Sequence, residues 1–216
     1  MSEAVDLALV LAIDTSGSVS DGRLALQRRG YEAAFRDPAL LHAVAAGPRG
    51  RIAATFVEWS DAGRQVQAVG WTLIAGVATA RGFADAIGHA LSPTPGWTSI
   101  SGAIDYSAAL LRRSGVNADR QVIDVSGDGS NNDGRPVAAA RDEAVTAGIT
   151  INGLPIVEID PTLDAYYRQH VIGGPNAFVV VARDAASFAN AVLRKLLVEV
   201  AGARPGALSR ASGEPR

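Results

Sequence analysis

Apolar runs separated by polar segments predict a regular alternation of strands and helices along the chain. Residues 5–13 are almost entirely apolar, which is typical of a central parallel strand covered on both faces. Shorter runs of the same kind predict further strands over residues 51–59, 65–73, 121–126, 149–157 and 177–181. Helical spacing predicts helices over residues 21–36, 38–46, 76–91, 99–113, 136–147, 162–170 and 184–201. The expected N-caps are Asp21, Asp37, Asp184 and either Ser99 or Ser101.

The order of these elements predicts an α/β fold. Residues 60–64 alone separate the second and third strands, which is too short for a parallel crossover and favours an antiparallel hairpin. We therefore expect a Rossmann-like, doubly wound, mainly parallel six-stranded sheet with one antiparallel edge strand and helices on both faces. Because the sequence has no internal repeat or interior linker, one domain is expected over residues 1–201. A mobile tail rich in Gly, Pro, Ser and Arg is expected over residues 202–216.

Composition excludes several functional classes. The 216 residues are 48% apolar and 19% charged, as in a globular protein. A formal net charge of −2 gives no basic footprint for nucleic acid. No apolar run approaches the roughly 20 residues that span a membrane. The absence of cysteine excludes disulfides, zinc sites made of thiolates and cysteine nucleophiles.

The first residues leave the compartment open. Residues 1–6 lack the basic segment of a signal peptide, and the apolar run that follows is short and ends at Asp14. The protein is cytoplasmic if the chain is taken as written. It is periplasmic or secreted if a signal peptide has been trimmed from it.

Open α/β sheets bind their ligands outside the carboxyl ends of the strands. Three polar segments of this chain are predicted to lie there. They are Asp14-Thr15-Ser16-Gly17-Ser18, Gly96-Trp97-Thr98-Ser99 and Ser126-Gly127-Asp128-Gly129. Hydroxyl and carboxylate oxygens are hard ligands that suit Mg²⁺, Mn²⁺ or Ca²⁺. The candidate metal ligands are therefore Asp14, Ser16, Ser18, Thr98 and Asp128.

Simpler interpretations of the same residues remain open. Serine and aspartate at strand ends often cap helices or form Asx turns, and Asp133 competes with Asp128 as the ligand of its loop. Asn131 and Asn132 are interpreted as turn residues. Trp97, Glu58 and Trp59 lie beside the candidate site in the predicted fold, where they either contact a partner or pack internally. The three histidines, His42, His89 and His170, lack the spacing of a metal site.

The ordered set of candidate ligands resembles a known site. Asp14-x-Ser16-x-Ser18 after an apolar strand resembles the metal-ion-dependent adhesion site of von Willebrand factor type A (VWA) and integrin I domains. Thr98 matches that family's threonine ligand, and Asp128 matches its later aspartate. The resemblance covers roughly residues 5–200. More narrowly, stretches 56–60, 96–103, 124–129, 151–156 and 170–175 are similar to an uncharacterised bacterial family of stand-alone VWA-like proteins.

The resemblance implies a function that the residues alone do not. It implies one bound divalent ion, with Mg²⁺ first and Mn²⁺ or Ca²⁺ as alternatives, held by Asp14, Ser16, Ser18, Thr98 and Asp128. One coordination position would stay open for a carboxylate from a protein partner, whose identity the sequence does not give. We expect a binding module and not an enzyme.

An enzyme is the alternative. An aspartate after the first strand of an α/β sheet is a familiar phosphoryl acceptor, so a metal-dependent phosphohydrolase or phosphotransferase would use the same carboxylates. Such enzymes of the haloacid-dehalogenase type need a second aspartate two residues later, where this chain has Ser16. The one lysine, Lys195, lies in the last predicted helix, far along the chain from these loops. Ser126 lacks the preceding glycine of a serine hydrolase nucleophile.

Overall fold

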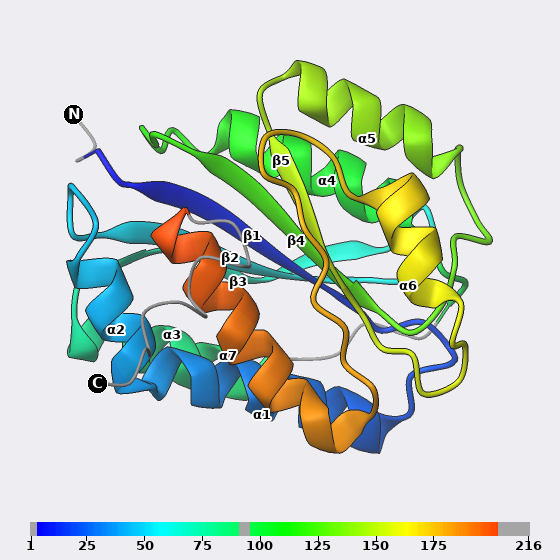
Figure 1. Ribbon diagram of the computed structural model, residues 1–216, viewed down its shortest axis with the longest axis horizontal. Coiled ribbons are helices and arrows are strands. Elements are labelled where there is room, and N and C mark those ends of the chain that lie inside the picture. The colour runs from blue at the N-terminus through cyan, green and yellow to red at the C-terminus, as the bar shows by residue number, and fades with distance from the viewer. Residues whose placement is uncertain (1–3, 91–95, 203–216) are drawn as a thin grey trace, which may run out of the picture.

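A five-stranded sheet forms the centre of the protein in the computed structural model, which describes residues 4–90 and 96–202. The strand order is β3 (Gln65–Ile74), β2 (Ile52–Trp59), β1 (Leu7–Asp14), β4 (Gln121–Gly127) and β5 (Thr150–Pro155) (Figure 1). Strand β1 pairs in parallel with β2 and β4, and β4 pairs in parallel with β5. Strand β3 pairs antiparallel with β2. The mainly parallel sheet with an antiparallel edge strand is confirmed.

The sixth predicted strand is the exception in this fold. Residues 177–181 make only isolated parallel bridges to β5, at Gly153↔Val179 and, just beyond, at Ile156↔Ala182. Between these two bridges, a regular strand would need a hydrogen bond donated by the backbone nitrogen of Pro155 on β5. Proline has no N–H, so this hydrogen bond cannot form. The ladder is interrupted there, so the prediction of a sixth regular strand is wrong, although this segment does run along β5.

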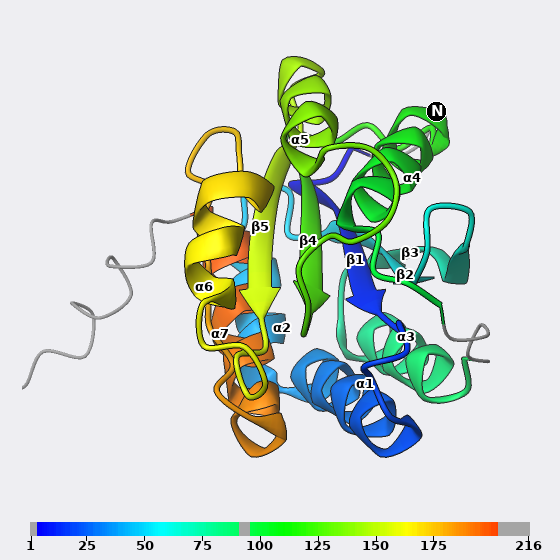
Figure 2. The same cartoon turned by 90° about the vertical axis from the view of Figure 1, so that its right-hand side faces the viewer.

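Helices cover both faces of the sheet (Figures 1 and 2). One face packs against α1 (Asp21–Arg36), α2 (Pro38–Ala45), α3 (Val77–Gly88) and α7 (Ala185–Ala201). The other face packs against α4 (Ile100–Arg113), α5 (Val137–Thr146), and α6 (Leu163–Tyr166) with the π-helical turn Tyr167–Val171 that continues it. Alternate residues of β1 serve the two faces: Leu9 and Leu11 pack in the first core, Val10 and Ala12 in the second.

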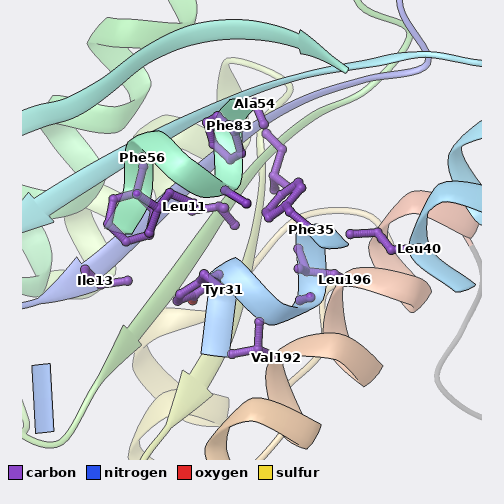
Figure 3. Close-up of a cluster of buried hydrophobic side chains, with 14 of the residues drawn as sticks. Leu11, Ile13, Tyr31, Phe35, Leu40, Ala54, Phe56, Phe83, Val192 and Leu196 are labelled. Atoms are coloured by element: carbon purple, nitrogen blue, oxygen red, sulfur yellow. The ribbon is translucent and has the colours of Figure 1, made fainter. Parts of the chain in front are cut away.

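Several aromatic side chains pack together within the first core (Figure 3). The ring of Tyr31 from α1 meets Phe56 of β2 edge-on, with centroids 5.5 Å apart. Phe35 and Phe83 make a similar contact at 4.8 Å. Rings of this size supply much of the apolar burial in a core, and edge-to-face pairs add roughly 0.5–1.5 kcal/mol each. Helix α1 is therefore firmly anchored on the sheet directly after the Asp14 loop.

The helix caps agree with most of the predictions. Asp37 caps α2 with Pro38 as its first residue, Ser99 caps α4, and Asp184 caps α7. The prediction for α1 is wrong, because Ser20 and not Asp21 is the N-cap: its Oγ accepts the Arg23 N–H at 3.4 Å. Of the tail predicted over residues 202–216, all but Gly202 lies outside the described residues, as does part of the predicted loop 92–98. None of the described helices is long and apolar enough to cross a membrane.

The connections make a topological switch point between β1 and β4, where open α/β sheets leave a crevice. The chain leaves β1 toward α1 on one face of the sheet, and leaves β4 toward α5 on the other face. The carboxyl ends of these neighbouring strands point the same way and lie side by side in Figure 2. Such a switch point is where open α/β sheets bind ligands. Asp14 ends β1 and Asp128 directly follows β4, so both lie at this crevice.

Candidate metal centre

The loop after β1 is folded by Asp14 itself. Asp14 is fully buried, and its Oδ1 accepts the Ser16 N–H at 2.7 Å, which is an Asx turn. This turn brings the Oγ atoms of Ser16 and Ser18 to 3.2 Å from each other. Thr15 points away, since its Oγ1 donates to the carbonyl oxygen of Trp59 at 3.0 Å. The spacing Asp-x-Ser-x-Ser therefore places three oxygen-bearing side chains on one side of the loop.

The loop after β4 meets this group of oxygens. The Ser18 hydroxyl donates to Asp128 Oδ1 at 2.6 Å. A cationic neighbour also reaches Asp128, because Arg23 Nη1 lies 3.7 Å from its Oδ2, too far for a hydrogen bond. The second guanidinium nitrogen of Arg23 lies 3.2 Å from Glu158. The structure therefore brings both predicted carboxylates into one crevice with the two serines.

The third segment is tied to the other two by backbone contacts. The Gly17 N–H donates to Gly96 O at 2.9 Å, and the Thr98 N–H donates to Asn132 Oδ1 at 2.8 Å. In return, the Asn132 N–H donates to Thr98 O at 2.9 Å. A Cβ built on Gly129 would lie 3.6 Å from Thr98 Oγ1, so the buried Thr98 hydroxyl lies beside the Asp128 loop. All five candidate ligands are therefore gathered at the same edge of the sheet.

The asparagines of the β4 loop do more than form a turn. Asn131 Oδ1 accepts the Ser101 N–H at 3.0 Å, and Asn132 holds the Thr98 backbone as described above. Asp133, considered as a competing ligand, turns to another segment, where its Oδ2 accepts the Ala62 N–H at 2.8 Å. These supporting roles were missed from the sequence because they depend on which loops the fold brings together. The run of three consecutive polar residues, Asn131-Asn132-Asp133, was the one feature of the sequence that could have indicated these roles.

Two buried oxygens of the site are left without a hydrogen-bond donor. They are Asp14 Oδ2 and Asp128 Oδ2, for which the described residues supply no hydrogen-bond partner, although Arg23 forms an ion pair with Asp128. The pKa of Asp14 is raised from 3.8 to about 7, chiefly by burial; hydrogen bonds from Ser16 oppose this rise, and the nearby charge of Asp128 adds to it. Buried carboxylate oxygens normally find donors or a cation. Two such oxygens at one place are compatible with a bound cation.

The donor set also fits a hard divalent ion. Ser18 gives its one hydroxyl hydrogen to Asp128, which leaves the lone pairs of its oxygen available to a metal. Adjacent ligands of an octahedral Mg²⁺ lie about 2.9 Å apart, which is close to the 3.2 Å between the Ser16 and Ser18 oxygens. Among the described residues no three or more of His, Cys, Asp and Glu are grouped to hold a metal. A metal centre here therefore needs the serine and threonine hydroxyls.

The three candidate partner contacts, Trp97, Trp59 and Glu58, differ in their exposure to solvent. Trp97 is 69% exposed and lines an open hollow with Ser18, Arg64, Thr98 and Asn132. Trp59 is fully buried in the core under α4, so of the two alternatives left open for it, internal packing is the one that the structure has.

Glu58 is also fully buried, and it too packs internally. Its carboxylate is bound by the guanidinium of Arg28, with Nε 2.8 Å from Oε1. Burial raises the pKa of Glu58, and the contact with Arg28 opposes that shift. Helix α1 covers this strand end, so Glu58 holds α1 to the sheet and does not face solvent.

Solved structures share this fold at low sequence identity. The proximal thread matrix protein 1 from the mussel byssus, with a zinc-occupied MIDAS motif, has a TM-score of 0.62 at 13% identity over 91% of this chain and 46% of its own. The pilus adhesin SpaC from Lactobacillus rhamnosus GG has a TM-score of 0.65 at 12% identity, over 93% of this chain and 31% of its own. A von Willebrand factor type A protein from Catenulispora acidiphila has a TM-score of 0.58 at 18% identity, over 92% of this chain and 43% of its own.

This chain therefore has the α/β fold of VWA domains, and it spans less than half the length of each of these three relatives. A family model described as "Protein of unknown function (DUF1194)" matches residues 4–204. The chain belongs to that family. No curated protein matches it in sequence.

Proposed function

We propose that this protein is an interaction module that works through one bound divalent ion, Mg²⁺ first and Mn²⁺ or Ca²⁺ as alternatives. The observation that carries the proposal is the Ser18–Asp128 hydrogen bond beside two buried carboxylate oxygens that lack donors. Asp14, Ser16, Ser18, Thr98 and Asp128 would hold the ion. A relative with the same fold has its MIDAS motif occupied by zinc, which supports a divalent ion at this position of the fold.

The partner would offer a carboxylate to the ion. Two carboxylates balance the charge of a divalent cation, and the neutral hydroxyls add no further negative charge. An ion held this way, with a coordination position open, still attracts an added anionic ligand. When bound, the metal would supply one open coordination position that polarises such a ligand. The chain's own residues would orient the approach, because the hollow beside Ser18 and Thr98 is lined by Arg64 and the exposed Trp97. Trp97 is the residue we assign to partner contact.

A peptide display library tests this proposal although the natural partner is unidentified. The protein is immobilised, and peptides are selected in Mg²⁺ and eluted with EDTA. We expect the eluted peptides to share an aspartate or glutamate whose replacement by asparagine or glutamine abolishes binding. Peptides that stay bound in EDTA, or that bind without an acidic residue, would contradict a metal-bridged contact.

A phosphatase assay separates the module from the enzymatic alternative. The protein is incubated with a generic aryl phosphate and Mg²⁺ or Mn²⁺, beside Asp14→Ala. The module is expected to show no turnover above that variant. The one lysine of the chain lies away from the site, buried in α7 against Asp124. Robust metal-dependent hydrolysis lost in Asp14→Ala would replace the module with a phosphohydrolase.

A further inference from the structure

A buried tyrosine approaches the candidate metal centre from behind. Tyr167 is the first residue of the π-helical turn that continues α6, beside β5 in Figure 2. It is fully buried, and the described residues give its hydroxyl no hydrogen-bond partner. Buried tyrosines normally find such a partner, so this hydroxyl calls for an explanation.

Two glycines on neighbouring strands make room for this side chain. A Cβ on Gly153 of β5 would lie 2.7 Å from Tyr167 Cδ1, and a Cβ on Gly127 of β4 would lie 3.0 Å from its hydroxyl oxygen. Neither glycine has a positive φ, so backbone conformation does not require them. They permit the close approach of one ring, which packs over β5 and carries its hydroxyl to the end of β4.

The same notch at Gly127 contains the unpaired oxygen of Asp14. A Cβ on Gly127 would lie 2.9 Å from Asp14 Oδ2 and 3.0 Å from the Tyr167 hydroxyl, so the two oxygens are within about 6 Å of each other. Oδ2 is the Asp14 oxygen that lacks a donor, whereas Oδ1 holds the Ser16 N–H. A phenol has one hydrogen to donate and a carboxylate only accepts. Two complementary buried groups, each without a partner, therefore face the same small space.

We propose that Tyr167 is a positioning residue of the metal centre, whose hydroxyl donates to Asp14 Oδ2, directly or through one water, when the site binds its ion. This inference rests on the proposed function. Metal ligands are commonly oriented by such outer hydrogen bonds, which fix the carboxylate so that its other lone pairs face the ion. Burial raises the pKa of Tyr167 well above its usual value, so the phenol keeps the proton that it donates.

The neighbouring residue reinforces the link between this helix and the site. The Tyr166 hydroxyl accepts the Asn131 N–H at 3.3 Å, which holds the loop that follows Asp128. Consecutive tyrosines at the junction of α6 and the π turn therefore contact the loop after β4 and the notch beside β1. The α6 segment and the turn after it therefore lie against the loop that follows Asp128 and the notch that contains Asp14 Oδ2.

Calorimetric titration with Mn²⁺ and Mg²⁺ tests the inference on the whole chain. Tyr167→Phe removes only the hydroxyl and should weaken metal affinity by about tenfold. Because the hydroxyl is unpaired before binding, the thermal midpoint of the metal-free variant should change by less than about 3 °C. Tyr31→Phe is the matched control, since Tyr31 is equally buried on the opposite face of the sheet, and it should leave the affinity unchanged.

The outcomes separate this inference from the proposed function. An unchanged metal affinity in Tyr167→Phe would overturn the positioning role. So would a weakened affinity accompanied by a large fall in the metal-free midpoint, since that pattern belongs to a purely structural hydroxyl. If the wild-type protein binds neither ion, the metal centre itself is wrong and the positioning role falls with it.

Discussion

Ser18 and Asp128 are 110 positions apart in the sequence, yet the Ser18 hydroxyl donates to the Asp128 carboxylate at 2.6 Å. This contact joins the loop after β1 to the loop after β4 across the switch point of the sheet. It consumes the one hydrogen of Ser18 and leaves its oxygen lone pairs directed elsewhere. If a cation lies in this crevice, the pair is the centre of its binding site.

Removing the Ser18 hydroxyl should weaken metal binding without unfolding the protein. Ser18→Ala deletes one proposed ligand and the hydrogen bond to Asp128, so Mn²⁺ affinity measured by calorimetry should fall by at least about tenfold. Ser130→Ala is the matched control, because Ser130 is exposed and follows Asp128 in the same loop. Equal affinities in the two variants would remove Ser18 from the ligand set.

Replacing Asp14 should change how stability depends on pH. Burial raises the pKa of Asp14 from 3.8 to about 7, so between these values the folded protein keeps a proton that the unfolded chain has released. In the metal-free protein the contribution of Asp14 to stability is therefore lost as the pH rises from about 4 to 7. Asp14→Asn should remove this contribution, whereas those of Asp124, whose pKa is also raised to about 7 by burial, and of Glu58 should remain.

Urea unfolding in EDTA across this pH range measures the effect. Added Mg²⁺ should oppose the decline in the wild-type protein, because the ion binds Asp14 in its ionised form and more tightly as the pH rises. The variant should lack most of this response to Mg²⁺. The same pH slope in both proteins would show that Asp14 does not hold the proton.

Much of the fold follows from the sequence because the apolar pattern is unambiguous. The continuous apolar run of β1 has one interpretation, and the short link before β3 forces a hairpin. The five candidate ligands were identifiable because each one ends a strand or precedes a helix.

The errors come from information that lies in other segments. The sixth strand was predicted from its own composition, but Pro155 on its neighbour interrupts the ladder. Glu58 ends a strand, and nothing in the local pattern shows that Arg28 from α1 covers it. Tyr167 has no motif, and the glycines at 127 and 153 that accommodate it were the one signal available.

An alanine at position 127 should disturb the site through its shape. Its Cβ would lie 2.9 Å from Asp14 Oδ2, which is closer than side chains tolerate, so the carboxylate must shift. Gly127→Ala should therefore weaken Mn²⁺ binding in calorimetric titration. Gly129→Ala meets Thr98 only at ordinary contact distance, 3.6 Å, and should bind more tightly than Gly127→Ala. The reverse order would contradict this geometry.

Trp97 should matter for the partner and not for the metal. A large exposed aromatic side chain at the rim of a binding site often contributes strongly to affinity. Trp97→Ala should therefore weaken the binding of a selected acidic peptide by about tenfold or more. Its Mn²⁺ affinity should stay at the wild-type value. Val77→Ala, at an exposed apolar residue that begins α3, provides the control. Peptide binding unaffected by Trp97→Ala would exclude this side chain from the interface.

Lys195 should be essential to stability although it is far from the proposed chemistry. Its Nζ lies 2.5 Å from Asp124 Oδ1 and 2.5 Å from Glu199 Oε1, and all three side chains are buried. Lys195→Met leaves two buried carboxylates without their cation and should cost about 3–5 kcal/mol in urea unfolding. Arg36→Met, which breaks solvent-accessible ion pairs with Glu32 and Asp85, should have a small effect. Similar losses in the two variants would contradict this role of Lys195.

Anomalous diffraction from crystals grown with Mn²⁺ would locate the proposed ion itself. We expect one anomalous peak in the crevice between β1 and β4, within ligand distance of the Ser16 and Ser18 hydroxyls. We also expect this peak to be absent in Asp14→Ala. Strong Mn²⁺ peaks elsewhere on the protein with none in this crevice would contradict the metal centre.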